Sequence, residues 1–565
     1  MDIIQFKEAN CKGCYKCIRN CDIKAIKFSN EQARILDSEC IYCGKCTLVC
    51  PQNAKVIKQD LPETKAFLAE GKKLYASVAP SFVAAFPNVS FSQFSKALKK
   101  LGFSLVEETA IGASMVSAEY TKLMQAQEMS NIITTCCPTI NLLVEKYYPE
   151  LVRYLAPVIA PASAHAKTLK EIYGDEIKVV FIGPCISKKY EAQMTNYIDT
   201  VLMFDELVEW LNEKNVYFDE DDNDLSEIHN TISRFYPVPR GIIHTIPEDI
   251  RSNYKTIAID GLDRCIDVLN SMKSGKIDGY FIEMNSCVGS CVAGPGMHNE
   301  NIPFLSARDI ILDGINKQTF SPIPKTEKAR TDLSKSFTLT LVKDKVPDES
   351  TISSILASIG KTSQAQMLNC GACGYSTCRD KAIAVFQGKA DLKMCLPYMR
   401  EKAESMSNII LDNTPDAIFV TDKEFNVLEF NRAAKNMFKQ IDGNTVGLPI
   451  EMLINSEDFE NIKSNGENIY YAICHDTTNE LVLNISIVCA PNSDFIIIAK
   501  DVSAEHLQNL EMEKIRKDTL ETTQKVIDKQ MRVAQEIASL LGETTGETKA
   551  ALTNLKKSIA QNQNL

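Results

Sequence analysis

Long apolar runs and clustered positive charge are what this 565-residue sequence lacks. No stretch reaches the roughly 18 consecutive apolar residues that a membrane-spanning helix requires. Its first residues, MDIIQFKEANC, do not follow the charged-then-apolar layout of a secretory signal. The formal net charge is -11, whereas nucleic-acid binding depends on concentrated Lys and Arg. We therefore expect a cytoplasmic protein with neither a membrane nor a nucleic-acid partner.

Cysteine, by contrast, is abundant, with 20 residues in the chain. In a reducing compartment so many cysteines point to metal binding or catalysis, because disulfide frameworks belong to oxidising environments. The length allows several domains, each with a core of its own. Each group of cysteines is therefore a candidate metal or catalytic site.

Two cysteine runs near the start of the chain repeat one spacing. They read CKGCYKCIRNCD and CIYCGKCTLVCP, with gaps of two, two and three residues between cysteines. This is the pattern of bacterial two-cluster ferredoxins, in which the fourth cysteine of each run ligates the other cluster. A zinc ribbon needs no trailing cysteine in both runs. Residues 1–58 are thus predicted to bind two 4Fe-4S clusters, one held by Cys11, Cys14, Cys17 and Cys50 and the other by Cys40, Cys43, Cys46 and Cys21.

Three further cysteine stretches lie between residues 130 and 300: TTCCPT, FIGPCISKKYEA and EMNSCVGSCVAGPG. Each lies where an apolar run, such as KVVFI or GYFIE, meets a Gly/Pro turn. The thiols are therefore expected at the ends of buried strands, which is where ligands of α/β sheets gather. The cysteines in question are Cys136, Cys137, Cys185, Cys287 and Cys291.

These three stretches, behind a two-cluster ferredoxin pattern, resemble the signature motifs of iron-only, or FeFe, hydrogenases. The resemblance is close over about residues 1–300 and looser to about 345. It implies a two-lobed α/β domain over residues 70–345 that holds an H-cluster, which is a 4Fe-4S cubane joined to a di-iron unit with CO, cyanide and azadithiolate ligands. It further implies H2 and protons as substrates, a redox partner such as ferredoxin, and separate maturation enzymes that assemble the di-iron unit.

The resemblance also implies roles for individual residues. The matches to the cubane ligands are Cys137, Cys185, Cys287 and Cys291. Cys291 would also bridge to the di-iron unit, and Cys136 would be the free thiol that passes protons to it. Lys188 and Ser81 match the residues that face the two cyanide ligands, and a buried anionic ligand requires such donors.

Several positions depart from the pattern of hydrogenases built for turnover, which carry two glutamates and a serine between the free cysteine and solvent. Glu119 matches one glutamate, but Lys122 is expected at the position of the nearer glutamate and Ala156 at that of the serine. The replacements expected around the di-iron unit are Gly183 and Asn285 for methionines and Ala162 for a glutamine. Because general acid-base partners typically contribute a factor of roughly 10² to 10⁴, these losses predict slow turnover, which suits a sensor.

A fourth cysteine group follows in residues 346–400. Its members are Cys370, Cys373, Cys378 and Cys395, with gaps of two, four and sixteen residues. The spacing resembles the small 4Fe-4S domain of corrinoid iron-sulfur proteins, and a structural zinc site is the alternative. In total the sequence predicts three accessory 4Fe-4S clusters besides the H-cluster.

The last 160 residues carry no cysteines at ligand spacing. Residues 405–503 show alternating strands, a helix and a final strand that leaves into a helix, and they resemble a PAS domain with Asn431 in the FN position. Residues 504–565 place apolar side chains at helical spacing, which favours an amphipathic or coiled-coil helix and a homodimer; they are Ile527, Met531, Ala534, Ile537 and Leu541. We expect a separate signalling protein to read the PAS domain.

The sequence thus predicts a multidomain α/β and α+β protein with three possible functions. The first is a sensory FeFe hydrogenase that turns over H2 slowly and reversibly. The second is a metabolic hydrogenase linked to ferredoxin. The third is a non-catalytic iron-sulfur scaffold that lacks the di-iron unit.

Overall fold

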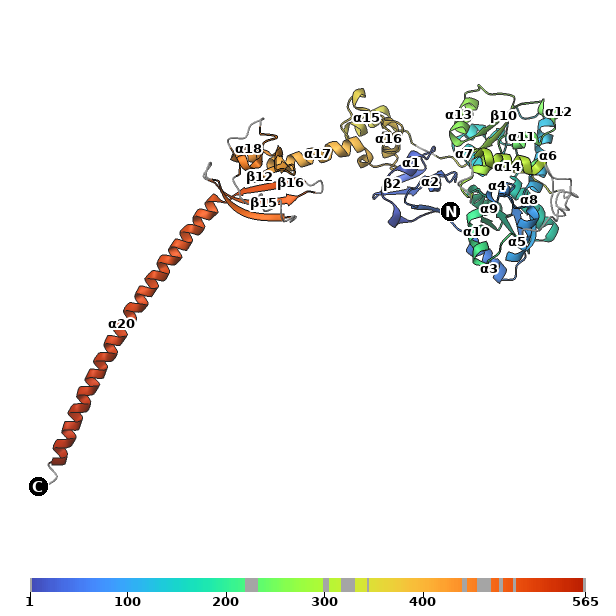
Figure 1. The fold of residues 1–565 in the computed structure, drawn as a ribbon. Helices are drawn as coiled ribbons and strands as arrows, with labels where there is room; N and C mark the ends of the chain where they lie inside the picture. Colours follow the sequence, from blue (N-terminus) through green and yellow to red (C-terminus); the bar gives the residue numbers. More distant parts are fainter. Residues whose placement is uncertain are drawn as a thin grey trace. The chain divides into compact units, whose positions relative to one another are not determined.

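The structure is a computed structural model that describes residues 3–218, 232–297, 304–316, 331–342, 345–438, 445–454, 469–476, 481–490 and 494–561. Its internal contacts divide the chain into two compact units, residues 1–399 and 400–565. Both parallel and antiparallel sheets are present, so the predicted α/β and α+β architecture is confirmed (Figure 1). Within the described residues, no helix is long and apolar enough to cross a membrane.

The first 58 residues form two small antiparallel strand pairs. Strand β1 (Ile4–Phe6) pairs with β4 (Lys55–Ile57), and β2 (Ile26–Ser29) pairs with β3 (Gln32–Ile35). Two single-turn helices, α1 (Lys16–Arg19) and α2 (Lys45–Leu48), carry the third cysteine of each run. The short cysteine spacing therefore wraps each run around a turn of helix.

Two parallel sheets form the centre of the first unit. The larger has the order β6-β5-β8-β9, with β5 (Leu74–Val78), β6 (Phe103–Glu108), β8 (Lys178–Ile182) and β9 (Thr200–Leu202). The smaller has the order β10-β11-β7, with β7 (Ile132–Ile133), β10 (Lys255–Asp260) and β11 (Tyr280–Asn285). Every residue of β5 is buried, as expected for parallel strands covered on both faces.

Helices connect and cover these strands. The longer ones are α3 (Leu61–Ala69), α5 (Phe91–Leu101), α6 (Ala110–Ala126), α7 (Pro138–Tyr147), α8 (Pro161–Tyr173), α9 (Ser187–Thr195), α10 (Phe204–Glu213), α13 (Leu262–Lys273) and α14 (Phe304–Asn316). Three single-turn helices are α4 (Phe82–Ala85), α11 (Gly241–His244) and α12 (Glu248–Arg251). Helix α7 begins directly after Cys137, with proline at its first position, where a missing N–H costs nothing.

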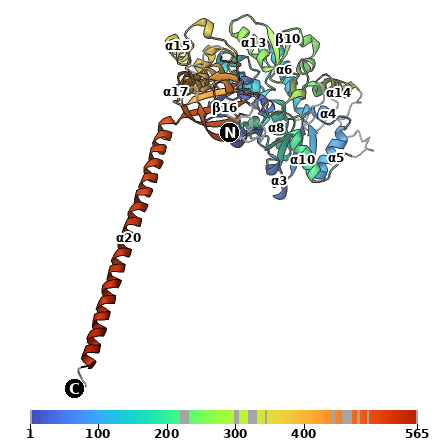
Figure 2. The same ribbon diagram turned by 60° about the vertical axis from the view of Figure 1, so that its left-hand side comes forward.

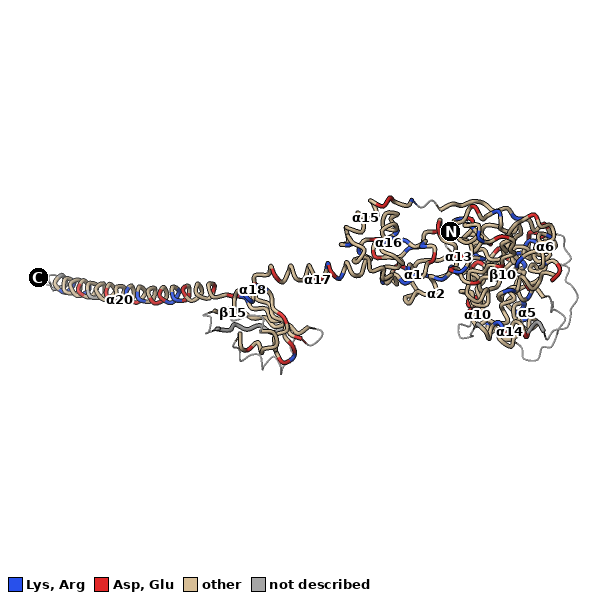
Figure 3. Tube along the Cα trace, turned by 90° about the horizontal axis from the view of Figure 1, so that it is seen from above, with Lys and Arg blue, Asp and Glu red and all other residues tan. Residues whose placement is uncertain are grey.

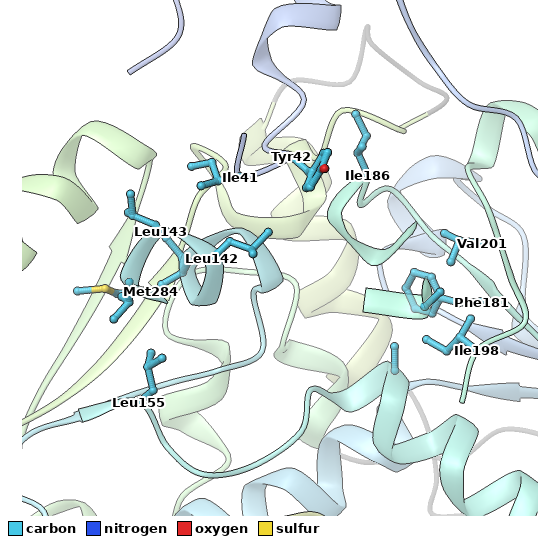
Figure 4. Packing of buried hydrophobic residues seen from close by; sticks show 14 of the residues in the cluster. Ile41, Tyr42, Leu142, Leu143, Leu155, Phe181, Ile186, Ile198, Val201 and Met284 are labelled. Atoms are coloured by element: carbon cyan, nitrogen blue, oxygen red, sulfur yellow. The ribbon is translucent and has the colours of Figure 1, made fainter. Parts of the chain in front are cut away.

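The N-terminal segment is packed firmly against this α/β body. Ile41 and Tyr42 belong to the same buried cluster as Leu142, Leu143 and Ile186, as Figure 4 shows. The Tyr42 ring stacks on that of Tyr190 at 5.3 Å between centroids, and the Lys146 ammonium donates to the Cys40 carbonyl oxygen at 2.7 Å. The second cysteine run is therefore fixed beside α7, the helix that follows Cys137.

The fourth cysteine group lies on a small helical segment made of α15 (Glu349–Ala357) and α16 (Cys378–Phe386). It docks on the ferredoxin-like segment through backbone contacts. The Lys24 ammonium donates to the carbonyl oxygen of Gly374 at 2.9 Å, and the Phe28 N–H donates to the Lys389 carbonyl oxygen at 2.7 Å. These cysteines are thus held against the first cysteine run.

The second unit contains a five-stranded antiparallel sheet of order β13-β12-β16-β15-β14. Its strands are β12 (Ala417–Thr421), β13 (Val427–Phe430), β14 (Ile469–Asp476), β15 (Leu481–Cys489) and β16 (Phe495–Asp501), preceded by α17 (Leu396–Asn413) and interrupted by α18 (Arg432–Met437). The Asn431 side chain accepts from the N–H of Ala434 at 2.9 Å and so caps α18.

A single helix, α20 (Ser503–Gln561), follows the last strand (Figure 2). Acidic and basic residues are interspersed along it, as the colours of Figure 3 show. Four of the apolar side chains singled out in the sequence are about half exposed or more: Ile527, Met531, Ile537 and Leu541, at 49%, 58%, 52% and 61%. Within this single chain, the apolar stripe of α20 therefore stays in water.

Candidate metal centres

The carboxyl ends of both parallel sheets face one cavity in the first unit. Ser81 lies just beyond β5, Thr109 directly follows β6, and Cys185 lies just beyond β8. The smaller sheet contributes the cysteines after β7 and β11. The cysteines that line the cavity are Cys136, Cys137, Cys185, Cys287 and Cys291. Its empty space is about 860 Å³ including the part open to solvent.

Burial and mutual charge both act on this group of thiols. Burial first, and the neighbouring Cys185 and Cys137 second, raise the pKa values of both Cys287 and Cys291. Several thiolates in one buried cavity are stable only if positive charge joins them. The donor set therefore fits an iron-sulfur cluster, which thiolates hold and whose iron supplies that charge.

Two polar side chains point to anionic ligands in the same cavity. The Ser81 Oγ is buried and has no hydrogen-bond partner among the described residues, so it can donate to a bound group. Lys188 is buried and forms an ion pair with Glu191 at 2.5 Å. Burial lowers the pKa of Lys188, but the charges of Glu191 and Cys185 outweigh it, so the pKa lies above its ordinary value. Both residues fit ligands such as cyanide, which need donors in a buried site.

Cys136 lies in a different environment from its neighbour Cys137. Its Sγ is 3.3 Å from the Tyr120 hydroxyl, which also accepts the Thr135 N–H at 2.9 Å. Burial raises the pKa of the Cys136 thiol to about 12, although the Tyr120 hydrogen bond and the Lys188 charge lower it. Cys136 is therefore a protonated thiol at neutral pH that faces the cavity and can donate a proton.

Lys122 is not where the sequence placed it. Its side chain is 69% exposed and pairs with Glu119 at 2.6 Å on the outer face of α6. The expectation that Lys122 replaces the first proton carrier next to Cys136 is therefore wrong. The α6 residue beside Cys136 is Tyr120, two positions earlier, because a helix turns by about 100° per residue and this shift moves a side chain to the opposite face.

Several segments of the chain are similar to known protein families. Residues 72–295 match the family model "Iron only hydrogenase large subunit, C-terminal domain". This segment is similar to an iron-only hydrogenase domain. Other segments of the chain match "4Fe-4S dicluster domain" over residues 3–51, "Putative Fe-S cluster" over residues 366–397 and "PAS domain" over residues 406–469. The predicted family resemblance is confirmed for these segments.

Two curated relatives are hydrogenases by name. Iron hydrogenase 1 of Clostridium pasteurianum is 26% identical over 378 residues, which make up 53% of this chain and 66% of the relative, just under two thirds of its length. The periplasmic Fe hydrogenase large subunit of Nitratidesulfovibrio vulgaris is 26% identical over 367 residues, 52% of this chain and 86% of the relative. A solved structure of FeFe-hydrogenase HydA1 from Chlamydomonas reinhardtii has 17% identity, covers 50% of this chain and 100% of its own, and gives a TM-score of 0.39.

The other departures noted in the sequence lie at or near the cysteine-lined cavity. A Cβ atom at Gly183 would lie 2.8 Å from the Ala79 Cβ and 2.9 Å from the Phe181 ring, so no larger residue fits there without movement. Asn285 and Ala162 line the cavity, and Ala156 is fully buried in an apolar cluster beside it. At the first three of these departures the chain therefore has glycine, asparagine and alanine, where the resemblance led us to expect methionine and glutamine.

The accessory cysteines gather in sets. One pocket is lined by Cys21, Cys40, Cys43 and Cys46, and another by Cys370, Cys373, Cys378 and Cys395. Both sets agree with the ligand groups expected from spacing, and their binding of clusters stays a prediction. The remaining set is Cys11, Cys14, Cys17 and Cys50, of which Cys14 is exposed and Cys17 buried. Among the described side chains, no three His, Cys, Asp or Glu come together as a site for a single metal ion.

Sequence reasoning missed several polar residues around Cys136. Glu283 lies within β11, and burial raises its pKa to about 7, although the N–H groups of Ile243 and Ile242 lower it. Tyr236 is buried and hydrogen-bonds Ser117 at 2.7 Å. An acidic residue inside the apolar run GYFIEMN was a signal that could have revealed Glu283, whereas the helical phase of Tyr120 needed the structure.

A comparison of Cys136 with Cys137 tests these assignments. After reconstitution with iron and sulfide alone, the native chain should hold up to four 4Fe-4S clusters. Cys137→Ala should lose about one cluster, because it removes a thiolate from the central set, whereas Cys136→Ala should retain the native iron and sulfide content. Chemical analysis of iron and sulfide measures both, and equal losses in the two variants would contradict the ligand map.

Proposed function

We propose that this protein is an FeFe hydrogenase that oxidises H2 slowly and reversibly, and that it serves as an H2 or redox sensor through its PAS domain. The observation that supports this most directly is the cavity itself. It combines the four cubane cysteines with a free protonated thiol, Cys136, and two donors for anionic ligands, Ser81 and Lys188. A scaffold that held only a cubane would need none of these three.

The H-cluster, when bound, supplies the chemistry that splits H2 into protons and electrons. Cys137, Cys185, Cys287 and Cys291 would hold its cubane, and Cys291 would also contact the di-iron unit. Lys188 and Ser81 would each donate to a cyanide ligand. Lys188 does so with its ammonium held in place by Glu191, and charge-assisted bonds of this kind contribute roughly 1.5 to 3 kcal/mol.

Cys136 would carry protons between the di-iron unit and the protein. It lies on the cavity wall, within hydrogen-bond reach of Tyr120, and a general acid must lie within such reach of the group that it protonates. The next group after Cys136 is the phenol of Tyr120. Burial, together with Cys136, raises the pKa of this phenol well above its usual range. Tyr120 therefore holds its proton far more tightly than a carboxylic acid at the same place, and turnover is slow.

The accessory cysteines offer electrons a path through the first unit. The second cysteine run is fixed beside α7 by Tyr42 and Lys146. The fourth group is docked on the first run through Lys24 and Lys389. Electrons would pass along these clusters to a ferredoxin-like partner.

The signalling role rests on the second unit. A PAS domain is followed by a 59-residue helix, α20, whose apolar side chains are exposed in the single chain. Pairing of two such helices would bury this stripe, so we propose a homodimer whose state is read by a separate protein. The alternative, a metabolic ferredoxin-linked hydrogenase, would show fast turnover with the same active site.

Infrared spectroscopy tests the hydrogenase assignment. After treatment with the maturation enzymes, the protein should show bands from bound CO and cyanide, and it should be inactive when given only iron and sulfide. Cys291→Ala should lose these bands, because the bridge to the di-iron unit is gone. CO bands of native intensity in that variant would refute the ligand assignment, and their absence from the native protein would favour the iron-sulfur scaffold.

Substitutions at Tyr120 and Lys122 on α6 test which of these two residues limits proton transfer to and from Cys136. Tyr120→Glu should raise H2 evolution with a viologen donor, by up to about 10², because a carboxylic acid then lies beside Cys136. Lys122→Glu is the matched control and should leave the rate unchanged, because its side chain is in solvent. Cys136→Ala should slow the native rate by roughly 10² or more.

The three rates are measured at equal content of di-iron unit, judged from the infrared bands. A gain in Lys122→Glu equal to that in Tyr120→Glu would mean that bulk charge, not the position beside Cys136, sets the rate. A native rate equal to that of metabolic hydrogenases would refute the slow proton step.

Truncation tests the proposal that the second unit serves sensing and is not needed for catalysis. A chain ending at Met399 retains the whole first compact unit, so H2 oxidation with an artificial acceptor should stay within about twofold of the full-length rate, because all four cluster sites lie within that unit. Residues 400–565 alone should dimerise, which analytical ultracentrifugation can measure. Loss of turnover with intact clusters would favour a second unit that takes part in electron delivery.

A further inference from the structure

Two serine hydroxyls lie beside the sulfur atoms of the central cysteine set. The Ser187 Oγ is 3.2 Å from the Cys185 Sγ. The Ser286 Oγ is 3.7 Å from the Cys137 Sγ and 3.9 Å from the Cys287 Sγ. The proposed hydrogenase chemistry assigns no role to either serine. Three of the four proposed cubane ligands therefore have a hydroxyl within hydrogen-bond reach of their sulfur.

The backbone that positions the cysteines also positions these serines. Ser187 is the first residue of α9, two positions after Cys185, and it is only 1% exposed. Ser286 directly follows β11 and is half buried. Strand β7 pairs with β11 in parallel, so the hydroxyl after β11 meets the thiol of Cys137, which follows β7. Each hydroxyl is thus placed beside sulfur by the fold and not by a mobile side chain.

The state of the thiols decides which atom donates. A thiol can donate or accept, but the form that ligates a metal is the thiolate, which has no hydrogen and can only accept. When the cubane is held, each hydrogen must therefore come from a hydroxyl. Ser187 then donates to Cys185. Ser286 has one hydroxyl hydrogen, which it directs to Cys137 or shares with Cys287.

Such hydrogen bonds favour the reduced form of the cluster. Reduction adds one electron, and therefore one negative charge, to a buried cavity, where uncompensated charge is costly. A donor next to a thiolate interacts more strongly with the more negative state, and this difference is larger in the protein interior than in water. Hydrogen bonds to the sulfur atoms are among the factors that set iron-sulfur potentials. No proton moves and no covalent bond breaks in this one-electron step.

The serines contact one part of the proposed cofactor site. The sulfur atoms that they reach belong to the cysteines that would hold only the cubane. Cys291 would bridge to the di-iron unit, and Lys188 and Ser81 would donate to its cyanide ligands. The two hydroxyls therefore act on the part of the cofactor that stores an electron, through the thiolates that bind it.

We propose that Ser187 and Ser286 raise the reduction potential of the central cubane by donating hydrogen bonds to its thiolates, and that they thereby lower the H2 pressure at which the cubane becomes reduced. The second part rests on the proposed hydrogenase function. One H2 supplies two electrons, which reduce the central cubanes of two molecules, and its two protons go to solvent. A tenfold gain in the one-electron equilibrium constant therefore lowers the H2 pressure for half reduction about a hundredfold.

The first test measures the potential and needs no di-iron unit. The full-length chain is reconstituted with iron and sulfide, and its reduced clusters are followed by electron paramagnetic resonance as the solution potential is varied. The signal of the central cubane is the one that Cys137→Ala lacks. Ser187→Ala should lower the potential of this signal by about 59 mV, which is a tenfold change for a one-electron couple. Ser286→Ala should lower it by about threefold in the same constant, because its contacts are longer and water can replace a half-buried hydroxyl.

The control is Thr64→Val, which removes a buried hydroxyl that contacts Thr200 Oγ1 at 2.8 Å and not a cysteine. It should leave the potential unchanged, and Ser286→Thr, which keeps the hydroxyl, should retain the native value. If both alanine variants keep the native potential with native iron and sulfide content, the proposal is refuted. If Ser187→Ala does not hold the central cubane, the shift in Ser286→Ala decides the question.

The second test uses the fully assembled enzyme, in which infrared CO bands of native intensity show that the di-iron unit is present. Half reduction of the cubane should require about a hundredfold higher H2 pressure in Ser187→Ala than in the native protein. An unchanged H2 requirement, in a variant whose potential has fallen, would refute the link to H2. If the native protein shows no CO or cyanide bands after maturation, the hydrogenase function fails, whereas the potential shifts of the first test still decide the role of the serines.

Discussion

The constraint on which this structure depends is the burial of several thiols in one cavity. Burial and mutual charge raise the pKa of Cys287 and Cys291, so the group is unfavourable until iron joins it. Two parallel sheets make the arrangement possible, because their carboxyl ends converge and each contributes a loop with cysteine or a polar donor. Gly183, beside Cys185, is required by close packing, because an added Cβ would lie 2.8 Å from the Ala79 Cβ and 2.9 Å from the Phe181 ring.

Much of the protein could be read from the sequence, for a local reason. Ligands such as Cys11, Cys14 and Cys17 are separated by two residues, so their meeting depends only on the turn that they share. The pairing of Cys21 with the second run was also predictable, since that exchange belongs to the motif, and the structure does line one pocket with Cys21 and the second run. The PAS strands and the final helix followed from their periodicities of two and of three to four residues.

The prediction for Lys122 was wrong because it assigned the residue to the wrong face of α6. Contacts between residues far apart in the sequence were not predicted at all. Lys122 and Tyr120 are two residues apart, but they lie on opposite faces of α6, so an alignment error of that size exchanges a buried neighbour of Cys136 for a solvated lysine. Ser77 and His165 are 88 residues apart, and no local pattern brings them together. In the sequence His165 stands among alanines, and only the packing of α8 on β5 gives it a partner.

The polar side chains of the cysteine-lined cavity differ in whether they have a hydrogen free to donate to a bound group. Lys188, Ser81 and Cys136 each present a hydrogen, and a site that binds anionic ligands favours such groups. The hydroxyl of Thr109 differs from these, because it is already hydrogen-bonded to Ser77. Ser77 in turn bonds His165, which lies against the Glu107 carboxylate. The hydrogen bonding of a residue on the cavity wall therefore depends on a carboxylate three side chains away, which only the packing of α8 against β5 and β6 brings into reach.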